Sequence, residues 1–156
     1  MSTLAQFNTA KWLRGFVALF VACLLNYYGD RLLGVSIELF RGVKGFSPLW
    51  VVDLFILPFA LGFLVTMIYG AGGKWLSYFP PLIVRSIAYY QIDVSNLPSG
   101  ASLIPMGWWG FFVILAIESS AFGGIIGEVM IKSIYGRSPR HQIYKERADE
   151  EGDGQE

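Results

Sequence analysis

Three ionisable side chains lie inside long apolar stretches of this 156-residue sequence. They are Asp53, Arg85 and Glu118, and they make up half of the six acidic or basic residues between positions 51 and 130. On insertion scales, a charged side chain at the centre of a membrane-spanning helix costs about 2.5–3.5 kcal/mol. Charges that persist in such positions pair with one another, transfer protons or bind a ligand. These three residues therefore form a candidate intramembrane polar cluster.

The sequence leaves two interpretations of this candidate cluster open. In the functional one, the three residues relay protons or bind a substrate; in the structural one, they pair and hold helices together. Glu118 lies ten residues beyond Trp108, about 15 Å along a helix, where a carboxylate is expected to be protonated, paired or facing a polar cavity. Asp53 and Arg85 also have simpler explanations, as a carboxylate near a helix N-terminus and as a side chain that extends to the interface. Because no charge pattern repeats along a helix face, the sequence favours the structural interpretation.

Known catalytic and metal-binding patterns are missing from the sequence. Cys23 and His141 are the only cysteine and histidine, so an internal disulfide and a Cys/His zinc cluster are excluded. The glycines before Lys74 lack the spacing of a phosphate-binding loop. A net charge of zero gives no basic face for nucleic acid. The sequence predicts no enzyme activity, no metal site, no cofactor and no nucleic-acid partner.

The composition indicates that the elements carrying these residues are membrane-spanning helices. Hydrophobic residues make up 54% of the chain and charged residues 15%, whereas soluble domains carry about 25% charged residues. The apolar stretches predict three full spans, at about residues 11–31, 48–69 and 108–135. The second span starts at Ser47-Pro48, a capping hydroxyl followed by proline at the first helical position. Pro58 should kink this span near its middle.

One more helix is expected between the second and third spans. The prolines at positions 80 and 81 limit it to residues 81–90, about 15 Å long, which is too short to cross a bilayer alone. We expect it to be interfacial or re-entrant, with residues 29–47 as a linker and 91–107 as a loop. The predicted fold class is therefore an all-α integral membrane protein with three spans plus this short helix, or alternatively four spans, over residues 1–135.

The distribution of basic residues indicates the orientation. Residues 136–156 are predicted to form a charged, disordered tail, and the basic residues at its start favour a cytoplasmic C-terminus in the cell membrane. Lys11 and Arg14 favour, more weakly, a cytoplasmic N-terminus. Three spans put eight basic residues inside and four outside; four spans put eight inside, three outside and one in the bilayer. This comparison does not decide between three and four spans.

A row of small residues in the last span predicts close helix packing. Ser119, Gly123 and Gly127 are spaced by four, which lets two helix backbones approach each other. Their partner is another span of this chain, a second copy or a different subunit. The sequence thus predicts a structural or accessory membrane subunit, or a self-assembling helical module, that works in a homo-oligomer or a larger membrane complex. The alternative is a small transporter or channel component in which Glu118 and Arg85 line the path and Glu118 is the intramembrane carboxylate.

Overall fold

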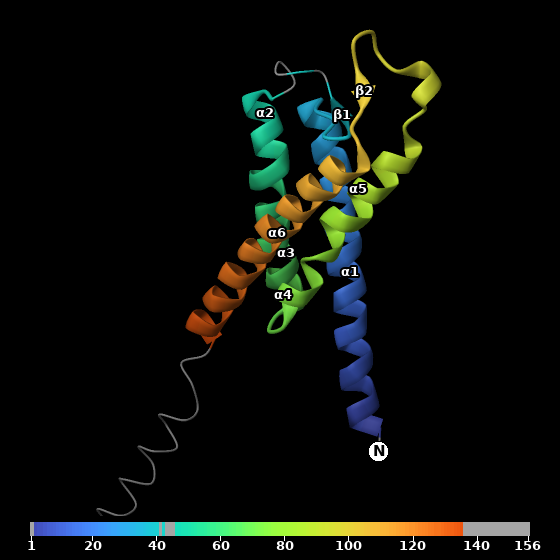
Figure 1. Cartoon of the computed structure of the whole chain (residues 1–156). Coiled ribbons are helices and arrows are strands. Elements are labelled where there is room, and N and C mark those ends of the chain that lie inside the picture. The colour runs from blue at the N-terminus through green and yellow to red at the C-terminus, as the bar shows by residue number, and fades with distance from the viewer. Residues whose placement is uncertain (1, 41, 43–45, 136–156) are drawn as a thin grey trace, which may run out of the picture.

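The computed structural model describes residues 2–40, 42 and 46–135, and it is mostly helical. The predicted tail, residues 136–156, lies outside the described residues. Figure 1 shows long helices that run side by side along the molecule, with a shorter helix and two small strands. Three helical segments are long and apolar enough to cross a membrane: Lys11–Leu33, Pro48–Tyr69 and Met106–Ile134.

The first helix, α1, covers Ser2–Leu33 and starts earlier than the position near Lys11 that the sequence predicts. The residues before Lys11 are mostly polar, but they include neither glycine nor proline, so nothing in them interrupts a helix. At its other end α1 stops at Gly34, which adopts φ +63°. Glycine takes this left-handed conformation without steric cost, and it turns the chain back toward the bundle.

The second long segment is one helical rod in three parts. It consists of α2 (Pro48–Val51), a π-helical turn η2 (Val52–Ile56) and α3 (Leu57–Tyr69). The side chain of Ser47 accepts a hydrogen bond from the amide of Trp50 at 3.3 Å, as expected for a helix cap. Pro58 would clash with the carbonyl four residues earlier in a regular α-helix. The wider π turn, in which the Leu57 amide donates to the Val52 carbonyl, lies directly before this proline.

Two shorter helices follow the second segment. The four-residue α4 covers Gly73–Leu76, and α5 covers Phe79–Gln91, where the sequence predicts a short helix over 81–90. A 3-10 turn, η3 (Val94–Asn96), follows, and Asp93 caps it by accepting hydrogen bonds from the amide and hydroxyl of Ser95. These hydrogen bonds favour the ionised carboxylate and hold the pKa of Asp93 below its ordinary value.

The structure adds one feature that the predicted all-α fold class did not include: the two connections expected to be irregular pair with each other. Strand β1 (Leu39–Phe40) runs antiparallel to β2 (Ser102–Leu103), with Leu39 opposite Leu103. The amide of Ile104 donates to the carbonyl of Glu38 at 3.0 Å and continues the pairing. Hydrophobic periodicity cannot reveal strands of two residues.

The last helix, α6 (Met106–Tyr135), packs closely along α3. A Cβ added to Gly123 would clash with the backbone carbonyl of Phe59, and one added to Gly62 would clash with the carbonyl of Ser120. The hydroxyl of Ser119 donates to the Phe55 carbonyl at 2.6 Å. The row of small residues at positions 119, 123 and 127 therefore packs against another helix of this chain, which is one of the three partners considered above.

The chain passes along the molecule four times. Figure 1 places the start of α1 and the end of α6 at the same end, which we call the terminal end. The two strands lie at the opposite end, which we call the strand end. Helix α1 runs from the terminal end to the strand end, and the segment from α2 to α3 runs back to the terminal end. Helices α4 and α5 then run part of the way toward the strand end, and α6 runs from the strand end to the terminal end. The short helix α5 is thus the main part of the third pass.

Candidate functional site

Arg85 lies at the centre of a largely buried group of charges, the Arg85 cluster, which consists of Arg85, Asp30, Glu38 and Asp53. Its Nη2 donates to Asp30 Oδ1 at 2.9 Å and to Asp53 Oδ2 at 2.8 Å. Its Nη1 lies 3.5 Å from Glu38 Oε1. The Arg85 residue is 1% exposed and Asp53 is 0% exposed. One guanidinium is therefore surrounded by three carboxyl groups, in surroundings where charge is expensive unless it is paired.

Each member of the Arg85 cluster comes from a different segment of the chain. Asp30 is in the last turn of α1, Asp53 is in the π turn η2, and Arg85 is in the middle of α5. Glu38 precedes β1 in the segment that the turn at Gly34 directs back over the bundle. The cluster thus joins three of the four passes and the strand pair, and it fixes the position of α5 against α1 and η2.

The hydrogen bonding within the cluster is incomplete. Among the described residues, Asp53 Oδ1, Glu38 Oε1 and Arg85 Nε are buried and have no hydrogen-bond partner. One turn before Asp30 on α1, both amide atoms of the fully buried Asn26 also lack a partner within the described part of the chain. Buried polar atoms in this state cost about 1–3 kcal/mol each unless water or another group satisfies them.

A polar pocket of about 380 Å³ adjoins the cluster between α1 and α5. Its walls include Asp30, Glu38 and Arg85 together with Arg31 and Gln91. The guanidinium of Arg31 lies 4.5 Å from the ring centroid of Tyr27, which also lines the pocket. The pocket is large enough for several water molecules or for a hydrated cation. It gives the cluster a route to polar surroundings.

The structure brings together two of the three residues of the candidate cluster. Asp53 and Arg85 form a direct ion pair, as one reading of the sequence proposed. Glu118 is not part of the cluster: it is exposed on α6, and its side chain forms no hydrogen bond or ion pair within the described residues. The side chains of Asp30 and Glu38 take the place that the hypothesis gave to Glu118.

Sequence reasoning missed Asp30 and Glu38, and only Asp30 carries a signal that could have revealed it. Asp30 continues a row at four-residue spacing through Ala18, Ala22 and Asn26, which are all fully buried. Small and polar residues at this spacing mark a helix face that packs against another helix. Glu38 lies in an irregular segment, and its position depends on the pairing of β1 with β2.

A second charged group, the Glu128 cluster, lies toward the terminal end and consists of Glu128, Lys74 and Lys132. Lys132 Nζ lies 2.9 Å from Glu128 Oε1, four residues apart on α6. Lys74 Nζ of α4 lies 3.9 Å from Glu128 Oε2. The side chains of Lys74 and Lys132 are 40% and 65% exposed. Two bases thus flank one acid, and both bases reach solvent.

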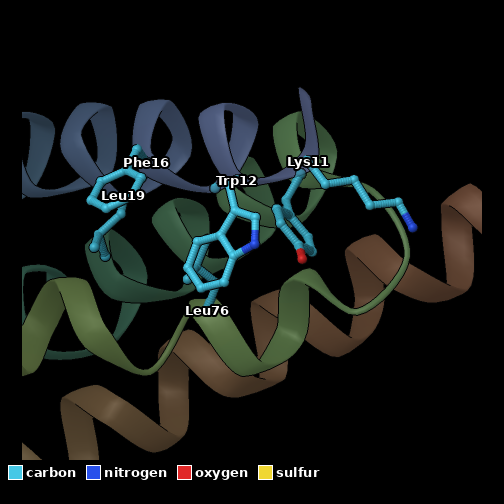
Figure 2. Close-up of a pocket in the computed structure, with 7 residues that line it drawn as sticks. Lys11, Trp12, Phe16, Leu19 and Leu76 are labelled. Atoms are coloured by element: carbon cyan, nitrogen blue, oxygen red, sulfur yellow. The ribbon is translucent and has the colours of Figure 1, made fainter. Parts of the chain in front are cut away.

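An apolar pocket of about 420 Å³ lies between α1 and the α3–α4 corner. Figure 2 shows Trp12, Phe16 and Leu19 on α1 and Leu76 on the facing segment. Apart from Lys11, its lining is aromatic, aliphatic or glycine. Such a pocket suits a hydrocarbon group better than a polar reactant, so it adds no chemistry to the Arg85 cluster.

The described residues contain no group of three or more His, Cys, Asp and Glu side chains arranged to hold a metal ion. Three acids do surround Arg85, but the guanidinium occupies the position between them. No family model, curated protein or solved structure matches this chain.

Proposed function

We propose that this chain is an accessory integral membrane protein that assembles with another membrane component through the outer face of α6. The outer face of α6 is the exposed row Phe111, Ile114, Glu118, Phe122, Ile125 and Val129. The observation that carries the proposal is the position of Glu118, an acid in the middle of this apolar row that has no ion-pair partner among the described residues.

Extensive apolar exposure supports membrane insertion. Large apolar side chains are exposed along α1 as well as α6, for example Phe16 and Phe20 at about two-thirds exposure. Continuous exposed apolar surface on this scale is unfavourable in water and is expected where lipid is the solvent. The three segments of membrane-spanning length carry most of it.

The topology that we propose has four passes, with both termini in the cytoplasm. Eight basic residues then lie on the cytoplasmic side: Lys11, Arg14, Lys74, Lys132 and four in the tail after position 135. Three lie on the other side, in the last turn of α1 and in the α1–α2 connection. This asymmetry agrees with the positive-inside rule. The cost of placing Arg85 in the third pass is reduced by its three carboxyl partners.

Cross-linking in native membranes tests the proposal. In a background with Cys23→Ala, the variant Phe122→Cys places a thiol next to Glu118 on the outer face of α6. We expect a bifunctional thiol–amine reagent to link this variant to one discrete partner. Phe20→Cys on α1 is the matched control, because both positions are phenylalanine on membrane-length helices and are 62% and 65% exposed.

The comparison between the two cysteines decides the proposal. A discrete adduct at position 122 that is absent at position 20 supports assembly through α6. The proposal is contradicted if both cysteines are cross-linked equally, and only to lipid or to many unrelated proteins. Replacing Glu118 with Gln should weaken the adduct at position 122 without changing the amount of folded protein, because Glu118 has no partner among the described residues.

A cation or proton pathway is a second candidate function, and the polar pocket beside Asp30 and Glu38 favours it. Three carboxyl groups around one guanidinium leave an excess of negative charge that a proton or cation can neutralise. The test is proton or sodium flux into vesicles that contain the purified protein. Flux above that of empty vesicles, reduced by Glu38→Gln, would support transport; no flux in folded protein would exclude it.

A further inference from the structure

We infer that the partner bound by the outer face of α6 is a membrane-spanning helix of another protein with a lysine or arginine near the middle of the bilayer. This inference rests on the proposed function and adds the chemistry of the partner. It follows from the depth of Glu118, from its surroundings on α6 and from the basic residues that this chain can supply.

Glu118 lies close to the midpoint of its span. The apolar segment runs from Met106 to Ile134, so Glu118 is about 18 Å from one end and about 24 Å from the other. A glutamate side chain is too short to reach either interface from this depth. An ionised carboxylate facing lipid at this point would be strongly unfavourable.

The outer face of α6 has the pattern of a helix-packing surface. Its residues follow one another at intervals of three or four, which keeps them on one side of the helix over about 27 Å. Glu118 has Ile114 on one side and Phe122 on the other, and both are more than half exposed. A helix laid along this row would cover the apolar side chains and enclose the carboxylate.

The opposite face of α6 is already occupied within the chain. Gly123 and Gly127 lie against α3, and the Ser120 hydroxyl donates to the Ser77 carbonyl at 2.7 Å. The exposed row therefore adds a second packing surface to a helix whose first one is filled. This separates assembly with a partner from folding of the chain itself.

Within the part of the chain that the structure describes, a second copy offers no complementary charge at this depth. Arg85 is buried with its own three acids, and Lys132 is bound to Glu128 near the end of α6. The remaining basic residues of the described membrane-length segments lie in their first or last turns. Two copies related by a two-fold axis along the membrane normal would place their two Glu118 side chains against each other. The two carboxylates would repel each other unless they share a proton. A basic residue from another protein satisfies the carboxylate directly.

Designed transmembrane peptides test this inference without knowledge of the natural partner. The probes are three polyleucine helices that differ at the central position, which is lysine, leucine or glutamate. Association with the labelled full-length protein is measured by energy transfer in phosphatidylcholine vesicles. We expect about fivefold to thirtyfold tighter association with the lysine peptide than with the leucine peptide. Glu118→Gln should bring the two affinities close together.

Glu128→Gln is the matched control, because it removes the other carboxylate of α6, near the end of the helix. It should leave the preference for the lysine peptide unchanged. Equal association of all three peptides would overturn the inference. A preference for the glutamate peptide, or self-association of the wild type that Glu118→Gln abolishes, would also overturn it and would assign the face to a second copy.

The peptide experiment and the cross-linking experiment can fail independently. A discrete adduct at Phe122→Cys without any preference for lysine would keep the accessory function and reject the basic partner. Loss of both results would reject the two proposals together. Monodisperse elution and helical circular dichroism of Glu118→Gln establish that the variant is folded, so that weak binding cannot be attributed to unfolding.

Discussion

Arg85 is enclosed by three carboxyl groups at its end of the bundle, whereas Glu128 toward the terminal end is flanked by two lysines that reach solvent. The Arg85 cluster joins α1, η2, α5 and the segment before β1; its 2.8 Å contact with Asp53 is buried, and its 2.9 Å contact with Asp30 is partly buried. The Glu128 cluster joins only α4 and α6. The two clusters therefore differ in both dielectric surroundings and connectivity. Loss of one group should have very different consequences in each.

The largest difference is expected for removal of the basic residue. Arg85→Met would leave the buried Asp53 and Glu38 and the partly buried Asp30 without their common partner. It should destabilise the fold by about 3–5 kcal/mol, the usual cost of breaking a buried ion pair. Lys132→Met is the matched change in the Glu128 cluster and should have a much smaller effect. Unfolding of both variants by sodium dodecyl sulfate in mixed micelles measures the difference. Similar stabilities would show that the Arg85 cluster does not hold α5 in place.

The excess of acid in the Arg85 cluster leads to a second, intermediate prediction. Asp30→Asn or Asp53→Asn alone should cost about 1 kcal/mol, because each variant leaves Arg85 one close carboxylate and removes some repulsion between acids. The double variant leaves only Glu38, at 3.5 Å. It should therefore cost more than the sum of the single changes, by about 1–2 kcal/mol.

A double-mutant cycle measured by the same unfolding titration checks this prediction. Strictly additive effects would mean that the two aspartates stabilise the fold independently and do not share Arg85. The wild type and the two single variants serve as internal references, because asparagine preserves the size of the side chain and one acceptor oxygen.

The sequence predicted the long helices more successfully than the charged clusters, and the reasons are physical. Apolar length and the signal at Ser47-Pro48 are local, and they place the second segment at Pro48–Tyr69. The approach of Asp30 and Glu38 to Arg85 depends on how separate elements pack. The two-residue strands that position Glu38 have no periodicity that could be detected in advance.

The position of Glu118 outside the Arg85 cluster follows from the geometry of α6 alone. Successive residues of an α-helix are rotated by about 100°, as 3.6 residues per turn requires. Because Ser119 faces η2 and Gly123 and Gly127 face α3, Glu118 points away from that contact. Glu118 and the small-residue row therefore lie on different sides of α6, a separation that follows from their spacing in the sequence. The row is the better guide to the interior of this bundle.

Salt dependence gives the smallest expected effect and the sharpest contrast between the two clusters. Glu128→Gln removes the carboxylate that lies 2.9 Å from Lys132 and 3.9 Å from Lys74. Both lysines reach solvent, so mobile ions screen these pairs over a Debye length of about 8 Å at physiological ionic strength. The loss of stability caused by Glu128→Gln should therefore shrink as sodium chloride is raised. The loss caused by Arg85→Met should largely persist, because Arg85 and Asp53 are buried and mobile ions screen a buried pair much less than an exposed one. Unfolding titrations at low and high salt measure both losses.

The contrary outcome would separate the two candidate functions. If the effect of Arg85→Met also disappeared at high salt, ions would have to reach Arg85 through the pocket beside Asp30. That result would favour the transport function over a purely structural cluster.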